Sequence, residues 1–308
     1  MDGNGLEVWS GRANPWECDQ MGHLNVRFHI AKAMEALAAF AAEVGMPRAF
    51  APSAESTLNV RELHIRFLRE AKPGAGLSVS VAVTALGEAD ARVLLVMRHD
   101  SGEPASTFHA QVEHVTAREG RAFAWPARVL ARLQELGGEV PAFAAPRGLT
   151  LAPVTTIASL DRARELGIAR TSTGVITPAD CDAFGRMRPE VFIGRISDGL
   201  TRMPGRALPG ARPEAQGQGV GGAALEYRLL HHAWPRAGDR VTVFGGLAEA
   251  QERTRRVVFW MVDPDSGRPW GSAEGVAASF DLAARKLVVL SPEALAAVRA
   301  DVTPGLAL

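Results

Sequence analysis

The chain is built from two copies of one unit, and this duplication constrains its fold more than any other feature. Three pairs of segments match in the same order: 17–23 with 180–186, 62–81 with 224–243, and 100–102 with 265–267. The offsets between partners are 163, 162 and 165 residues, a drift that small loop insertions produce. Matches in one order across most of each half indicate an internal repeat.

Each half is predicted to contain the same elements in the same order. An extended stretch, at 6–12 and again at 170–176, leads into the Cys-Asp turn. A helix follows it in the first half, because Ile30, Leu37 and Phe40 have the spacing of an amphipathic helix. Further extended runs are predicted in the first half at 58–70, 77–86, 91–99 and 105–116, and Pro-started closing helices at 126–136 and 292–300.

This order of elements predicts an α+β fold. A helix after a first strand, followed by long antiparallel strands, suggests in each unit a curved sheet wrapped around a central helix. We expect a first unit at 1–145, a Gly-, Pro- and Ala-rich linker at 146–155 and a second unit at 156–308. The two units are expected to pair as a pseudo-dimer.

The balance of charge bears on the class of partner. Lys plus Arg and Asp plus Glu are both 34, so the formal net charge is zero, which argues against nucleic acid and anionic membrane as partners. The amino-terminal residues do not resemble a signal peptide, and the apolar stretch 30–46 contains Lys32, Glu35 and Glu43, so no membrane span is expected.

The cysteine content bears on compartment and metals. Only two cysteines occur, Cys18 and Cys181, which fits a reducing, cytoplasmic compartment. So few cysteines, with scattered histidines, predict neither a structural zinc site nor another metal. No cofactor is expected.

A family resemblance enters at CDQMGHLNVRFHIAKAMEA. It resembles the opening of hot-dog fold thioesterases of the 4-hydroxybenzoyl-CoA thioesterase-like kind, and the matching residues are Asp19, Gly22, His23, Leu24, Asn25 and Glu35. Val26 stands where many members have a second Asn. Plant-type acyl-carrier-protein thioesterases, which are double hot-dogs, are similar at Asp19 and His23 but differ at Met21. The resemblance implies two tandem hot-dog units, thioesterase activity and a catalytic role for Asp19.

Asp19 has two interpretations. It could cap a helix, since Asp is favoured at the N-cap. It could instead act in catalysis, because thioester hydrolysis needs a carboxylate nucleophile or a base that activates water. Amides at the helix start near Gly22 to Asn25 would then polarise the thioester carbonyl, and Gly22 would let the acyl group approach closely. The family resemblance favours catalysis.

The other candidates of the first copy are also open to two interpretations. His23 could orient the acid, bind substrate or shuttle a proton, or it could be a histidine satisfied by backbone. Asn25 could hold the carbonyl or cap the helix. Glu35 could be a base or a surface ion-pair partner. Cys18 is expected to be a small buried residue rather than a nucleophile, and Glu17 to be solvated.

The second copy keeps Asp182 and Gly185 but has Arg186 and Arg188 where the first has His23 and Asn25. Flanking arginines would keep Asp182 ionised, which suits an ion pair, or they could bind the phosphates of coenzyme A. We expect a degenerate second site that helps to shape the first.

The sequence therefore predicts hydrolysis of an acyl thioester. The expected carrier of the acyl group is coenzyme A, with acyl carrier protein as the alternative. The chain is expected to act as a single pseudo-dimer or as a homo-oligomer of pseudo-dimers. Two rivals remain. A hot-dog hydratase or dehydratase would change unsaturation instead of releasing thiol, and a non-catalytic acyl-CoA- or lipid-binding protein would bind without turnover.

Overall fold

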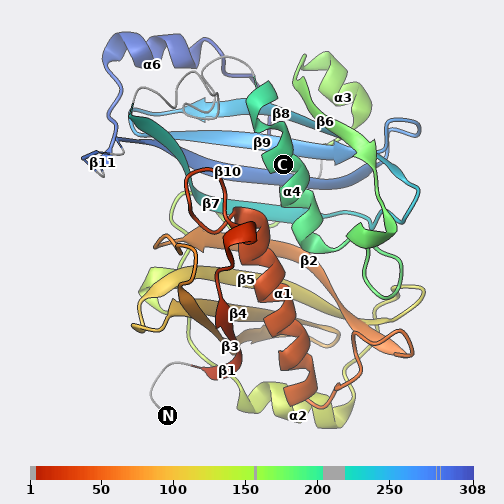
Figure 1. Ribbon diagram of the computed structural model, residues 1–308. Coiled ribbons are helices and arrows are strands. Elements are labelled where there is room, and N and C mark those ends of the chain that lie inside the picture. Colours follow the sequence, from red (N-terminus) through yellow and green to blue (C-terminus); the bar gives the residue numbers. More distant parts are fainter. Residues whose placement is uncertain (1–4, 156–157, 204–218, 282, 285) are drawn as a thin grey trace. The chain divides into compact units, whose positions relative to one another are not determined.

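The computed structural model describes residues 5–155, 158–203, 219–281, 283–284 and 286–308 (Figure 1). These form two compact units. The first comprises the chain up to Pro146 together with Cys181–Val191, and the second comprises Arg147–Asp180 and Phe192–Leu308. The segment with the second Cys-Asp turn thus groups by its contacts with the first unit, whereas the sequence-based boundary places it in the second.

The first unit is an antiparallel sheet with a long helix, α1 (Val26–Glu43), along one face (Figure 1). The strand order is β1-β3-β4-β5-β2. The strands are β1 (Leu6–Arg12), β2 (Ser56–Phe67), β3 (Gly76–Leu86), β4 (Asp90–His99) and β5 (Pro104–Thr116). They coincide with the predicted extended runs to within three residues, because alternating burial and the intervening turns are local signals.

Helix α1 buries one stripe of small and apolar side chains. Ile30, Leu37 and Phe40 are each at most 1% exposed, and the helix contacts β1, β3 and β4. A 3-10 turn, η1 (Pro15–Glu17), precedes α1, and the closing helix α2 (Ala127–Glu135) contacts β3. Burial of this stripe fixes α1 to the sheet and thereby fixes the turn from which it starts.

The second unit repeats this plan with strand order β7-β10-β9-β8-β6. The strands are β6 (Ala169–Val175), β7 (Val220–His231), β8 (Arg240–Ala250), β9 (Thr254–Val262), β10 (Pro269–Asp281) and the short β11 (Lys286–Leu287), which pairs with β10. The helical elements are α3 (Leu160–Glu165), η3 (Pro178–Asp180), α4 (Pro189–Gly199), η4 (Leu200–Arg202) and α6 (Pro292–Arg299). The sequence did not indicate α3.

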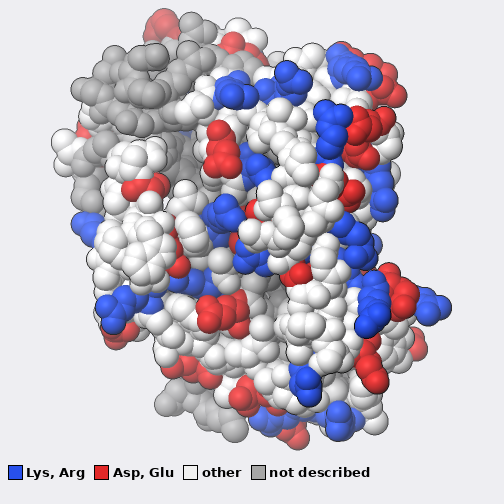
Figure 2. Space-filling view, turned by 45° about the vertical axis from the view of Figure 1, so that its right-hand side comes forward, with Lys and Arg blue, Asp and Glu red and all other residues white. Residues whose placement is uncertain are grey.

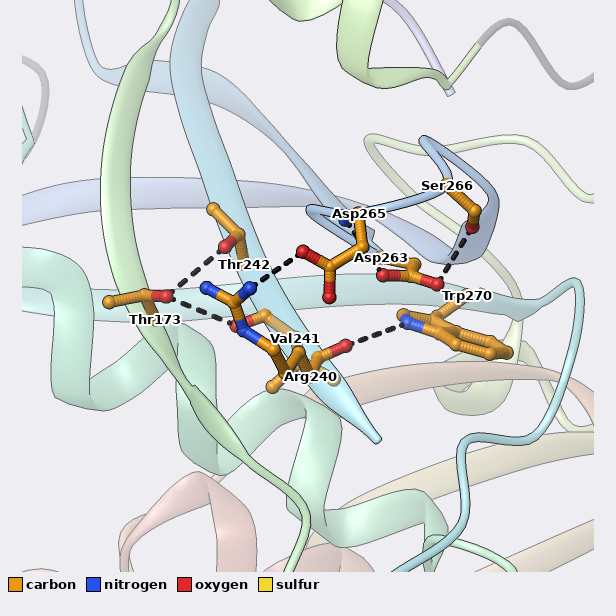
Figure 3. A network of polar contacts seen from close by, with 8 residues as sticks. All are labelled: Thr173, Arg240, Val241, Thr242, Asp263, Asp265, Ser266 and Trp270. Carbon is orange, nitrogen blue, oxygen red and sulfur yellow. Dashed lines mark hydrogen bonds and ion pairs between the residues drawn. The ribbon is translucent and has the colours of Figure 1, made fainter. Parts of the chain in front are cut away.

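The Asp-Ser-Gly turn between β9 and β10 shows how local polar contacts close a hairpin (Figure 3). Asp263 Oδ2 accepts from Ser266 Oγ at 2.7 Å, and this hydrogen bond lowers the pKa of the Asp263 carboxyl. Arg240, at the start of β8, pairs with Asp265 at 2.6 Å, and Trp270 Nε1 donates to the carbonyl of Arg240 at 3.2 Å. Asp-Ser-Gly is a composition typical of tight hairpin turns, and here it joins the antiparallel strands β9 and β10.

A duplicated arginine holds the linker in each unit. In the first unit, Arg66 Nη1 donates to the carbonyls of Phe143 and Ala145, at 2.7 and 2.8 Å. In the second, the equivalent Arg228 donates to the carbonyls of Thr150 and Ala152, at 2.8 and 2.9 Å. The segment 142–155, which comprises η2 (Ala142–Ala144) and the predicted linker 146–155, is therefore an ordered connection, called the linker strap, rather than a free tether.

Two further features concern the helices and the surface charge. None of the helices in the described residues is long and apolar enough to cross a membrane. Figure 2 shows basic and acidic side chains interspersed on the face turned to the viewer, in keeping with the balanced charge.

Candidate active site

Asp19 organises a tight turn that leads into α1. Its Oδ1 accepts from the backbone N–H groups of Met21, at 2.8 Å, and His23, at 3.2 Å. Its own N–H donates to the carbonyl of His23 at 2.9 Å, and Gly22 has φ +74°, a backbone region that favours glycine. Asp19 therefore shapes the turn and is not the helix N-cap.

The second copy builds the same turn. Asp182 Oδ1 accepts from the backbone N–H groups of Phe184 and Arg186, both at 2.9 Å, and Gly185 has φ +75°. The residues common to both copies thus perform one local structural task, whatever else Asp19 does. This explains why Cys-Asp-x-x-Gly survives in both halves.

The backbone amides expected to polarise a carbonyl are already used. The N–H of Gly22 donates to the carbonyl of Asp19, that of Leu24 to Ala71 at 2.7 Å and that of Asn25 to Glu17 at 2.9 Å. The expectation that the amides of Gly22 to Asn25 face the substrate is therefore wrong. The N–H of Val26 is the first helix amide without an acceptor among the described residues.

Asn25 is the N-cap of α1. Its Oδ1 accepts from the N–H of Arg27 at 2.9 Å, while its Nδ2 has no acceptor within the described part of the chain. The amide thus divides its two ends between different tasks. The oxygen caps the helix, and the nitrogen is left to donate.

His23 pairs with a residue that the sequence did not indicate. Its Nε2 lies 3.2 Å from Oε2 of Glu70, and the two side chains are 24% and 45% exposed. Glu70 follows β2 in the loop that meets the turn through the Leu24–Ala71 hydrogen bond. Because 47 positions separate the two residues, only the return of the chain along β2 brings them together.

Glu17, which we expected to be solvated, is paired, and its side chain is 12% exposed. Its carboxylate lies 2.8 and 3.0 Å from Nζ of Lys32, whose side chain is 7% exposed, and it also accepts from the backbone N–H of Asn14 at 2.9 Å. Lys32 belongs to α1, so this pair ties η1 to the helix.

Cys18 lacks the features of a nucleophile. Burial raises the pKa of its thiol, and the negative charges of Asp19 and Glu17 raise it further. Among the described residues, no three His, Cys, Asp or Glu side chains come together as metal ligands.

A family model decides the class of protein. The model of the thioesterase-like superfamily matches residues 13–133 and 176–298, which together make up most of the chain and include both Cys-Asp turns. The chain belongs to the thioesterase-like superfamily. A search of curated proteins gave no match.

Solved structures of similar fold span nearly the whole of this superfamily member. A protein from Lactobacillus plantarum, named provisionally as an oleoyl thioesterase, matches with TM-score 0.66 at 13% identity, and the match covers 90% of this chain and 97% of that one. An acyl-ACP thioesterase from Bacteroides thetaiotaomicron matches with TM-score 0.63 at 14% identity (87% and 96% covered). The 12:0-ACP thioesterase from Umbellularia californica matches with TM-score 0.63 at 12% identity (88% and 93% covered). The predicted fold of two tandem hot-dog units is confirmed, and superfamily membership identifies the chain as a thioester hydrolase.

Two of the predicted substrate-binding residues, Glu35 and Leu24, do not face the Asp19 turn as exposed side chains: Glu35 lies farther along α1, and Leu24 is buried. Glu35 is exposed on α1, nine residues beyond its first residue, or roughly 14 Å along the axis at 1.5 Å per residue. Leu24 is 4% exposed and belongs to the buried core. The structure therefore does not bring Glu35 to Asp19.

The arginines of the second copy bind protein groups. Arg186 is 3% exposed, its Nη1 donates to Asn59 Oδ1 at 2.7 Å, and its Nη2 donates to the carbonyl of Ala117. Arg188 pairs with the buried Glu190 at 3.0 Å. Arg186 thus anchors its segment to β2 and the end of β5 in the first unit.

Proposed function

We propose that the chain hydrolyses an acyl thioester with Asp19 as the acting carboxylate. One observation carries this proposal. Oδ1 of Asp19 is fixed by two backbone N–H groups, while Oδ2 has no hydrogen-bond partner in the described residues and the side chain is partly exposed. A carboxylate held by one oxygen presents the other in a defined direction.

Two routes use this oxygen. As a nucleophile, Oδ2 attacks the thioester carbonyl, the C–S bond breaks to release thiolate, and water then hydrolyses the mixed anhydride to free acid and Asp19. As a base, Oδ2 takes a proton from water, the hydroxide attacks the carbonyl, and the thiolate leaves. Both routes yield one acid and one thiol.

Both routes place negative charge on the carbonyl oxygen. The N–H of Val26 and Nδ2 of Asn25 are the donors left over at the start of α1, where the helix dipole also favours negative charge. They replace the amides of Gly22 to Asn25 in this role. His23, oriented by Glu70, would supply a proton to the leaving thiolate.

The carrier of the acyl group is coenzyme A or acyl carrier protein. The sequence resemblance suggested acyl-CoA first. Two structures that match over most of the chain are named as acyl-carrier-protein thioesterases, which supports the second carrier equally. We place the activity in the cytoplasm on the strength of the two-cysteine composition.

Free thiol release from a panel of acyl-CoAs and acyl carrier proteins tests the proposal. Asp19→Asn keeps an oxygen that can accept from Met21 and His23, so the turn persists while the carboxylate is lost. We expect kcat to fall by about 10²- to 10⁴-fold. Asp182→Asn makes the same local change in the second turn and is the matched control, with kcat unchanged.

The outcomes separate the alternatives. Equal loss of kcat in both variants would show that the second turn also acts. Acyl-CoA binding without thiol release would favour a binding protein, and altered unsaturation of the acyl chain would favour a hydratase. Full activity in Asp19→Asn would exclude the proposed role of Asp19.

A further inference from the structure

We infer that Trp16, with the cationic side chains of Arg12, Arg27 and Lys72, forms a docking surface for an acidic carrier protein that delivers the acyl thioester. This set is called the Trp16 surface. The inference rests on the proposed function and names the partner of the same site.

The first observation is the exposure of Trp16. Its relative exposure is 77%, the largest among the exposed large hydrophobic residues of the described chain. Tryptophan is highly buried on average, and it is enriched where proteins bind one another. An indole left in solvent three residues before the candidate catalytic Asp19 therefore points to a partner at this position.

The turn that carries Trp16 is rigid. In η1, Asn14 and Glu17 form a reciprocal capping box, and Lys32 of α1 grips the Glu17 carboxylate at 2.8 and 3.0 Å. Lys32 also lies over the ring of Trp9, 5.4 Å from its centroid. A side chain presented from so constrained a turn loses little conformational freedom of the backbone on binding.

A second loop completes the surface beside the site. The N–H of Ala13 donates to the carbonyl of Ala75 at 2.9 Å, and the N–H of Gly74 donates to that of Ala13 at 2.8 Å. These bonds, with the Leu24–Ala71 bond, place the loop of Lys72 against the loop of Trp16. A carrier that docks here would lie beside the Asp19 turn.

The charges of this surface are not balanced within the chain. Arg12 and Lys72 are exposed, Arg27 is half-buried, and none of the three has a hydrogen-bond or ion-pair partner among residues that the structure describes. The neighbouring acids are engaged, Glu17 by Lys32 and Glu70 by His23. The surface thus fits an anionic partner.

The arrangement favours a protein over a free phosphate. The three cations come from different segments, the end of β1, the first turn of α1 and the loop after β2, with the exposed indole among those segments. Cations from separate segments, together with an exposed indole, suit an acidic helix face that also offers an apolar contact. Arg27 and Asn25 at the start of α1 would then flank the thioester arm.

Binding is measured first, because it does not depend on turnover. An apo acyl carrier protein, which has no thioester arm, is titrated onto the full-length chain by calorimetry at low salt. We expect saturable binding that weakens at least tenfold in Trp16→Ala and in Arg12→Glu/Lys72→Glu, and that weakens with added salt in wild type. Arg128→Glu, an exposed charge reversal on α2, is the matched control and leaves binding unchanged.

Kinetics with one acyl chain on two carriers then test delivery. For the carrier-protein thioester we expect kcat/KM to fall at least tenfold in both surface variants, with acyl-CoA turnover unchanged.

No binding by wild type, or binding that both variants retain, overturns the inference. An equal loss with acyl-CoA overturns it in favour of a coenzyme A site. Self-association abolished by Trp16→Ala overturns it in favour of a second copy of the chain. Absence of thiol release despite carrier binding would instead refute the proposed hydrolysis.

Discussion

His29 is a buried histidine that the structure keeps neutral. It lies on the inner face of α1, with Nδ1 3.1 Å from Ser106 Oγ and its ring edge-on to Phe67. Burial lowers its pKa to about 3, and the nearby Lys32 and His99 act in the same direction. The fold therefore discriminates against protonated His29.

This discrimination predicts a dependence of stability on pH. Below pH 6.5 the unfolded chain takes up a proton at His29 that the folded chain refuses until about pH 3, so stability falls as pH falls through that window. The loss is about 1.4 kcal/mol per pH unit, or roughly 2 kcal/mol between pH 7 and 5. Urea unfolding at both pH values should show this extra loss in wild type relative to His29→Gln. Equal losses in the two proteins would contradict it.

At the scale of elements, the linker strap depends on Arg66. The side chain leaves β2 and donates two hydrogen bonds to carbonyls of the 143–145 segment. Its partner Arg228 does the same on β7, so duplication supplied one arginine for each end of the linker. Each end of the connection is thus fastened to a sheet.

Arg66→Met should release the first end of this strap. We expect a loss of about 2 to 3 kcal/mol in the free energy of unfolding, because two carbonyls lose a charged donor. Limited proteolysis should cut near Phe143 faster than in wild type. Arg61 lies on the same strand as Arg66 and pairs with Glu113 of β5, with side chains 41% and 32% exposed, so Arg61→Met should cost less than about 1 kcal/mol. Similar costs for the two variants would argue against the strap.

At the scale of the whole molecule, residues distant in sequence complete the first unit. Arg186 follows Asn59 by 127 positions, yet its guanidinium is buried against Asn59 and the carbonyl of Ala117. The replacement of His23 by an arginine in the second copy therefore has a structural reason within this unit.

Removing Arg186 should destabilise the whole first unit. In Arg186→Met, a buried amide and a buried carbonyl lose their donor, and we expect a loss of about 2 to 5 kcal/mol. Hydrogen exchange should accelerate at amides of β2 and β5. Unchanged protection there would show that the guanidinium contributes nothing to the fold.

The sequence by itself determined the features that depend on neighbours along the chain. The strands from β1 to β5 and the DSG hairpins follow from alternation and turn chemistry within a few residues, and the duplication follows from comparing the two halves of the sequence. The Asp19–Gly22 turn is of the same kind, since the carboxylate and the amides that it binds lie within four positions.

Only the tertiary structure decided the partners that come from distant segments. Glu70 beside His23, Lys32 on Glu17 and Asn59 on Arg186 lie 47, 15 and 127 positions apart. No periodicity records such pairs, because strand pairing and helix packing create them after the local elements exist. Of the four amides from Gly22 to Asn25, that of Leu24 donates to the distant Ala71, whereas those of Gly22, His23 and Asn25 are engaged by Asp19 and Glu17 within the turn. Bonds between near neighbours form the Asp19 turn, whereas the folded chain decides which distant side chain, Glu70, lies beside His23.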